Sequence, residues 1–257
     1  MKFRINMLSI AVACIYLFLY MPIFVLALFS FNKNPFGFAW QGFTVQWYVE
    51  LLSAKELWVP LKTSLIIAVS AVILSSSMAL ALVLFLTRNM IVRVQPLFYL
   101  SLEIPEVVLA VGLLIFFQFF AIPLGLTTLI AAHTLIGLGY TVPLLYARFI
   151  TIKKSLIEAS LDLGASYSQT MRKVVIPLLM PALTSAALMV FIVSFDEFVL
   201  SFFCSGGAVQ TLPMYIFAMI RIGNVTLLGA FSIVLLVVTS LGVCFFSFLQ
   251  ATKVENS

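Results

Sequence analysis

Residues 63–86 read TSLIIAVSAVILSSSMALALVLFL, a stretch without one charged side chain. About 20 residues of α-helix are needed to cross the hydrocarbon core of a bilayer, which is about 30 Å thick. Five further apolar stretches reach this length, at residues 7–31, 96–120, 127–147, 178–203 and 227–249. The sequence therefore predicts an all-α integral membrane protein with six transmembrane helices.

The composition of the whole chain also indicates a lipid environment. Of 257 residues, 63% are apolar and 9% are charged, against about 25% charged residues in a typical soluble domain. The mean hydropathy is +1.21, and the net charge of +5 is too small to indicate nucleic-acid binding. The three cysteines are far apart and form no CxxC pair, so we expect neither a metal site nor a disulfide framework. We expect residues 1–257 to form a single transmembrane domain.

The basic residues predict how the helices are oriented, because cytoplasmic loops carry an excess of lysine and arginine. Six spans place both termini on one side, and that side collects ten basic residues against four on the other. The ten are Lys2, Arg4, Arg88, Arg93, Arg148, Lys153, Lys154, Arg172, Lys173 and Lys253, and the four are Lys33, Lys55, Lys62 and Arg221. Both termini are therefore predicted to be cytoplasmic. The stretch at 7–31 is longer than the apolar part of a signal peptide, so we expect it to be retained.

Two connecting segments are long enough to have structure of their own, the predicted external loop at 32–62 and the predicted cytoplasmic loop at 148–177. In the second loop, Ser166 and Gln169 have the spacing of a capping box, and Gly164 precedes them. This pattern predicts a helix, a glycine turn and a second helix on the inner membrane surface. Apolar residues recur at helical spacings along it, namely Leu156, Leu163, Tyr167, Met171 and Val174. Such a face suits either lipid head groups or a cytoplasmic partner protein.

The same loop carries the motif of a known family. Glu158-Ala159-Ser160, then Gly164, then Val174, Ile176 and Pro177 resemble the EAA loop of ABC importer permeases, although Ser160, Val174 and Ile176 depart conservatively from the family pattern. The resemblance implies the type I importer (MetI-like) permease fold, with six transmembrane helices. It also implies that this loop is the coupling helix, which contacts the ATP-binding subunit. The residues assigned to that contact are Glu158, Ala159, Ser160, Gly164, Ala165 and Ser166.

Other segments resemble the permease subunits of spermidine/putrescine importers, and the likeness, greatest to their C-type subunit, extends over nearly the whole chain. The segments are Phe36-Gly37, residues 40–44 (WQGFT), Trp47-Tyr48, residues 194–197 (SFDE) and Leu212-Pro213. The resemblance implies import of polyamines across the bacterial cytoplasmic (inner) membrane by alternating access. Related permeases carry iron, thiamine or anions, so another small substrate is the alternative.

The chain lacks the motifs of an ATPase. No segment reads G-x-x-x-x-G-K-[ST], and no LSGGQ-like stretch is present, so we expect a transporter subunit and not an enzyme. The resemblance implies four kinds of partner: lipid, a second and related permease chain, an external (periplasmic) substrate-binding protein, and two ATP-binding subunits that hold ATP and Mg. We expect no cofactor and no metal on this chain.

Acidic residues within the predicted spans are candidates for the substrate pathway, and they are Glu103, Glu106, Asp196 and Glu197. An ionised carboxylate at membrane depth costs about 3 kcal/mol, so it should face a pathway, a partner or a ligand. No basic residue lies in the core of any span, and a cationic substrate would supply the missing counter-ion. Glu103 and Glu106 should share one helix face, with a bend at Pro105. Asp196 and Glu197 should point about 100° apart.

Two further residues complete the predicted pathway. Ser194 belongs to the SFDE segment, and Trp47 lies near the external mouth, where an aromatic face could bind an ammonium group. His133 is the only histidine of the chain, and we expect a hydrogen-bonded packing role for it in preference to a proton relay. The run of serines at 75–77 indicates close helix packing.

Two other classes of membrane protein compete with the importer. A stand-alone, proton-coupled carrier could use the buried acids, but such carriers usually have internal repeats and more spans, and the EAA-like loop would be unexplained. An intramembrane enzyme would need a nucleophile with its base, or a metal set such as H-E-x-x-H, and one histidine provides neither. Co-purification of an ATPase distinguishes the importer from both.

Overall fold

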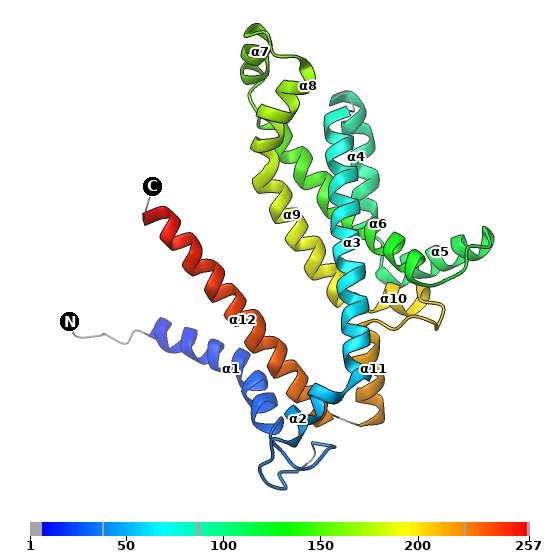
Figure 1. Ribbon diagram of the computed structural model, residues 1–257, viewed down its shortest axis with the longest axis vertical. Coiled ribbons are helices and arrows are strands. Elements are labelled where there is room, and N and C mark those ends of the chain that lie inside the picture. Colours follow the sequence, from blue (N-terminus) through cyan, green and yellow to red (C-terminus); the bar gives the residue numbers. More distant parts are fainter. Residues whose placement is uncertain (1–6, 38, 86–87, 224, 256–257) are drawn as a thin grey trace. The chain divides into compact units, whose positions relative to one another are not determined.

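The computed structural model describes residues 7–37, 39–85, 88–223 and 225–255, and the side chains of residues 8, 88, 89, 92 and 242–257 lie outside this description (Figure 1). The described residues form helices and one isolated β-bridge, between Asn32 and Phe43, which confirms the all-α prediction. They divide into two compact units, residues 1–57 with 216–257 and residues 58–215. That residues 1–257 form a single transmembrane domain stays a prediction.

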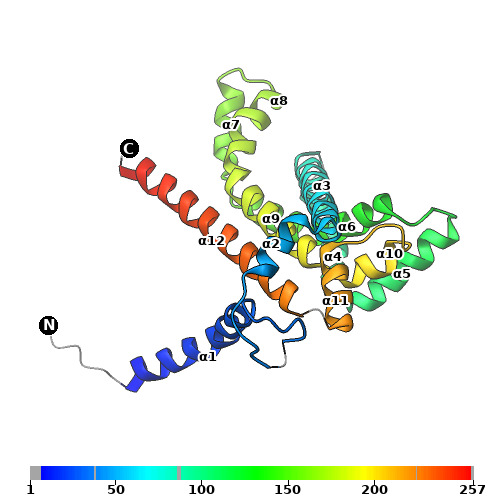
Figure 2. The same ribbon diagram turned by 60° about the horizontal axis from the view of Figure 1, so that its bottom comes forward.

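The larger unit is built around α6 (Leu126–Ile150). In the most apolar 18-residue segment of this helix, 72% of the residues are buried within the chain. Helix α6 packs against α4 (Arg88–Glu103) and α9 (Ile176–Asp196), and α10 (Val199–Cys204) packs against α5 (Glu106–Phe119). The unit also contains most of α3 (Lys55–Phe85), the start of α11 (Leu212–Ile222), and the short helices α7 (Lys154–Asp162) and α8 (Tyr167–Thr170). Figures 1 and 2 both show α7 and α8 at the end of α9 that is remote from α10.

Close packing around α6 depends on a glycine. A Cβ atom added at Gly137 would lie 2.9 Å from the Cβ and Oγ atoms of Ser75 on α3, and 3.0 Å from Cγ1 of Val190 on α9. Ser75 is fully buried at this point. The predicted packing role of the serine run is therefore confirmed for Ser75, because a small residue on each helix lets the two backbones approach.

Replacing Gly137 by alanine is expected to destabilise the chain by about 1–3 kcal/mol, because the added methyl group has no space and forces its neighbours to shift. Gly112, in the interior of α5, is the matched control, since nothing lies within 4 Å of a Cβ added there. Alanine at position 112 should leave stability unchanged or raise it. Thermal unfolding of the two detergent-purified variants measures the difference, and equal midpoints would contradict the packing assignment.

Four of the six predicted spans are helices that are long and apolar enough to cross a membrane, at Ser9–Phe29, Lys55–Phe85, Leu126–Ile150 and Tyr167–Asp196. The third predicted span is a helix pair, Arg93–Glu103 and Glu106–Phe119, bent by 108°. The sixth falls on α12 (Val225–Glu255), whose apolar part within the described side chains, Val225–Leu241, is shorter than the other spans. The described residues thus include four helices that could span a membrane, or five with the bent pair, and the count of six stays a prediction.

The bend in the third span is much larger than a local kink, although its place at Pro105 was predicted. Helix α4 ends at Glu103, and α5 begins at Glu106 with Pro105 as the preceding residue. Proline has no backbone N–H and disfavours a helical conformation in the residue before it, so it interrupts the helix here. The expectation that Glu103 and Glu106 share one helix face is wrong, because the two residues belong to different helices. Helix α4 packs along α6, whereas α5 packs mainly on α10 and makes a smaller contact with α6.

The smaller unit joins α1 (Met7–Phe29), α2 (Gln46–Ser53) and α12 through an ordered loop. Asn32 is fully buried in this loop, and its side chain bonds to the backbone of Ala39 and Gln41. The indole N–H of Trp47 donates to the carbonyl of Asn32 at 2.7 Å. Thr226, at the start of α12, donates to the carbonyl of Asn34 at 2.6 Å. The Thr226 bond attaches the loop to the beginning of α12, and the other bonds stabilise the loop itself.

Candidate functional site

The fifth predicted span does not continue to residue 203, because the helix breaks after Asp196. Glu197 leaves the helical conformation, with ψ of 109°, and α10 starts two residues later. The Glu197 side chain is only 7% exposed, and its Oε1 accepts a hydrogen bond of 3.0 Å from the backbone N–H of Leu200. Asp196 remains exposed within the chain. The break therefore directs the two neighbouring carboxylates into different surroundings, which agrees with the predicted divergence of the pair.

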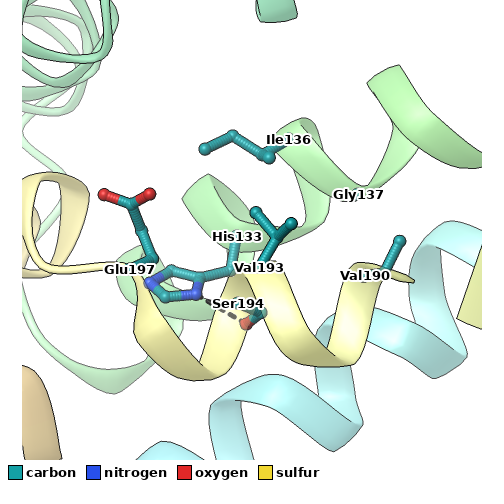
Figure 3. Close-up of a pocket in the computed structure, with 7 residues that line it drawn as sticks. All are labelled: His133, Ile136, Gly137, Val190, Val193, Ser194 and Glu197. Atoms are coloured by element: carbon teal, nitrogen blue, oxygen red, sulfur yellow. Dashed lines mark hydrogen bonds between the residues drawn. The ribbon is translucent and has the colours of Figure 1, made fainter. Parts of the chain in front are cut away.

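A buried histidine lies beside this break. His133 of α6 places its Nδ1 2.7 Å from the Oγ of Ser194 on α9 and its Nε2 3.2 Å from the Oγ of Ser201 on α10 (Figure 3). Ser201 in turn donates to the backbone carbonyl of Glu197 at 2.8 Å. The predicted hydrogen-bonded packing role of His133 is therefore confirmed, and its partners come from both sides of the break.

A small gap beside this histidine is too narrow to hold a water molecule. The residues that line it, shown in Figure 3, are His133, Ile136, Gly137, Val190, Val193, Ser194 and Glu197. Ser194, predicted to line the substrate pathway, is buried here and bonded to His133. In this conformation the cluster is a packed junction between three helices, so any substrate surface must lie on its outer side.

Three of the four predicted acidic residues come together at the junction. Glu106 and Asp196 both exert an electrostatic effect on Glu197, because α5 packs on α10 and brings Glu106 to the break. Glu106 and Asp196 are exposed within the chain, whereas Glu197 is buried. Neighbouring carboxylates repel each other when they are ionised, so a bound cation would stabilise the cluster.

The other two predicted pathway residues are not in this cluster. Glu103 is exposed at the end of α4, on the far side of the bend from Glu106. Trp47 belongs to the smaller unit, where its indole group stabilises the loop through the bond to Asn32. Among the described residues, no group of three or more His, Cys, Asp or Glu side chains could hold a metal ion.

The loop at 148–177 has the predicted helix, turn and helix. Gly164 adopts φ of +85°, a conformation that residues with a side chain rarely tolerate. The capping box is present, because Ser166 Oγ accepts from the N–H of Gln169 and Gln169 Oε1 accepts from the N–H of Ser166. The hydroxyl groups of Ser160 and Thr170 lie 3.0 Å apart and connect α7 to α8. The turn therefore has a defined conformation.

The second helix of this loop is not separate from the membrane span, which corrects the prediction. Residues 167–196 form one continuous helix with a π-helical turn at Met171–Val175. Pro177 follows this turn, and its ring would collide with the carbonyl four residues earlier in a regular helix, so a widened turn accommodates it.

The predicted apolar face of the loop is also divided. Met171 is buried, whereas Leu156, Leu163 and Tyr167 are exposed, and Leu163 is 89% exposed. Glu158 and Ala159 are exposed on α7, and Ser160 and Ala165 are partly exposed. Large apolar side chains gathered at an exposed tip mark a contact surface.

Sequence reasoning missed Ser201 and the helix break itself. A usable signal was present, because Ser194 and Ser201 are seven residues apart, a spacing that places both on one face of a helix. A single histidine in a neighbouring apolar helix needs polar partners when it is buried. The two serines were the available candidates.

The comparisons with known proteins agree with these features. Residues 92–253 match the family model described as "Binding-protein-dependent transport system inner membrane component". The spermidine/putrescine transport system permease protein PotC of Escherichia coli (strain K12) is 34% identical over 229 residues, which cover 88% of this chain and 86% of the relative. PotC of Haemophilus influenzae is 32% identical, with 88% and 89% covered. The putrescine transport system permease protein PotI of Escherichia coli (strain K12) is 31% identical over 216 residues, with 80% and 77% covered.

The family model covers more than half of the chain and includes the bent helix pair, α6, the EAA-like loop and the junction at Glu197. The resemblance drawn from the loop motif is thereby confirmed. The relatives are permease proteins of transport systems, which are not enzymes themselves. This chain therefore belongs to the family of multi-pass inner-membrane components of binding-protein-dependent transport systems.

Proposed function

We propose that this chain is a permease subunit of an ATP-driven importer that moves polyamines into the cytoplasm. The observation that carries the proposal is the carboxylate cluster of Glu106, Asp196 and Glu197 at the helix break. Polyamines are chains of ammonium groups separated by methylene groups, so they match several carboxylates set close together. The relatives are permease proteins of spermidine/putrescine and putrescine transport systems, which supports this class of cation.

The proposed residue roles follow from position. Asp196 and Glu106, which are exposed within the chain, meet the ammonium groups first, and Glu197 provides the buried charge behind them. Ser194 supports this surface from within the junction. Glu103 and Trp47 are candidates for other parts of the pathway. A substrate of this kind supplies the positive charge that the spans themselves lack.

The proposed complex contains partners that this chain requires for active transport. Two ATP-binding subunits bind ATP and Mg and contact the tip at Glu158, Ala159, Ser160, Gly164, Ala165 and Ser166. A second, related permease chain completes the pathway, and a periplasmic binding protein delivers the substrate. Both termini face the cytoplasm, in agreement with the excess of basic residues on that side. ATP binding and hydrolysis then open the site alternately to the two sides of the membrane.

Uptake of labelled putrescine and spermidine into cells that lack this chain tests the proposal. Complementation with the wild-type chain should restore uptake of at least one polyamine. The alternative is a permease for iron, thiamine or a similar small substrate, and labelled samples of these serve as the comparison. Restored uptake of one of these, without polyamine uptake, would contradict the polyamine assignment.

A further inference from the structure

His133 spans the break between α9 and α10 from a third helix. Its side chain is 2% exposed, and each ring nitrogen contacts a serine on a different side of the break, Ser194 before it and Ser201 after it. Figure 3 shows the ring beside Ser194, with the Glu197 side chain extending away from the junction. No other described side chain of α6 makes hydrogen bonds to both α9 and α10.

One tautomer of this histidine satisfies all of these contacts together. When the Ser201 hydroxyl donates its one proton to the carbonyl of Glu197 at 2.8 Å, its oxygen is left to accept from the Nε2–H of His133. A neutral imidazole carries one N–H group, so Nδ1 is an acceptor. It accepts from the Ser194 hydroxyl at 2.7 Å. The bonds therefore run in one direction, from Ser194 through His133 and Ser201 to the Glu197 carbonyl.

Both the backbone carbonyl and the side-chain carboxylate of Glu197 are therefore fixed by hydrogen bonds. Its backbone carbonyl accepts the last bond of this series, and its carboxylate accepts from the N–H of Leu200 in the first turn of α10. We infer that His133 is a positioning residue, which holds α10 through the contact of its Nε2 with Ser201 and thereby places the Glu197 carboxylate for the cation. This inference rests on the proposed function of Glu197.

The same bonds argue against a proton relay. The series ends at a peptide carbonyl, which cannot pass a proton onward, and the Glu197 carboxylate is bonded to a backbone N–H instead. If His133 only fills space, uptake should not depend on which ring nitrogen keeps its hydrogen-bond partner. The positioning role and the packing role therefore predict different uptake for different substitutes of His133.

Two conservative variants separate the functions of the ring nitrogens. Glutamine at position 133 keeps an N–H donor near the place of Nε2, and asparagine keeps a carbonyl acceptor near the place of Nδ1. His133→Asn should lower putrescine uptake per assembled complex by about fivefold, the effect of losing one buried hydrogen bond, and His133→Gln by no more than about twofold. Thr134→Val is the control, because Thr134 is buried on the same helix but bonds only to Ile130 of that helix.

A double-mutant cycle with Glu197→Gln decides between positioning and packing. If His133 acts through the Glu197 carboxylate, His133→Asn should cause no more than about a twofold further loss in the Glu197→Gln background. Equal losses in the Gln and Asn variants, or a full fivefold loss in both backgrounds, would overturn the inference alone. Unchanged uptake in Glu197→Gln by itself would overturn the proposed role of Glu197 and this inference with it.

Discussion

Replacing Glu197 by glutamine is expected to lower polyamine uptake by about thirtyfold, equivalent to about 2 kcal/mol, because it removes a buried charge that pairs with an ammonium group. Glutamine has nearly the same shape as glutamate, and its side-chain oxygen can still accept from the N–H of Leu200. The fold should therefore survive the substitution. Uptake of labelled putrescine, divided by the amount of assembled complex, measures the effect.

Glu50→Gln is the control for this experiment, since Glu50 is an exposed residue of α2 in the smaller unit. It should leave uptake within about twofold of the wild type, as surface substitutions usually do. Adding Asp196→Asn to Glu197→Gln should remove most of the remaining uptake, because both charges next to the break are then lost. Wild-type uptake in the double variant would exclude these two acids from the substrate pathway.

Leu163→Asp is expected to abolish co-purification of the ATP-binding subunits. Leu163 is 89% exposed in the turn between α7 and α8, so an aspartate there costs the chain itself little. An unpaired aspartate charge buried in an interface costs about 2 kcal/mol or more, so we expect at least about a thirtyfold weaker complex. Affinity purification through a tag on this chain, followed by quantification of the bound ATPase, measures the loss.

The same substitution at Leu52 provides a matched control. Leu52 is 80% exposed and lies in α2, within the loop predicted to be external. Leu52→Asp should retain the ATPase, because its position is on the opposite side of the membrane from the predicted cytoplasmic contact. Equal retention in both variants would contradict the assignment of the 148–177 loop as the coupling element.

Hydropathy predicted where the chain enters lipid but not where its helices break. Residues 63–85 of the first apolar stretch belong to one long helix, as expected from an uninterrupted apolar run. In the 178–203 stretch the apolar character continues past residue 196, yet the helix ends there, because hydropathy measures preference for lipid and not helix continuity. No glycine or proline marks this break. Its evidence is tertiary, namely the bonds of Glu197 to Leu200 and of His133 to two serines.

Local chemistry was more informative than hydropathy in the loop at 148–177. The capping residues Ser166 and Gln169 and the turn at Gly164 are short-range features, and the structure contains them as predicted. The exposure of Leu163 and the burial of Met171 were not predictable from spacing. They depend on the turn at Gly164, which separates Leu163 at the end of α7 from Met171 in the next helix, so one helical spacing does not run through both residues.

The break after Asp196 also has a consequence for hydration. The last four carbonyl groups of a helix have no N–H partner within it, and an unsatisfied carbonyl in lipid costs several kcal/mol. The junction around His133 has no room for a water molecule, whereas Asp196, the last residue of this helix, is exposed within the chain. An ammonium group arriving there would exchange its water shell for carbonyl and carboxylate oxygens one contact at a time, and would not have to lose the whole shell in a single step.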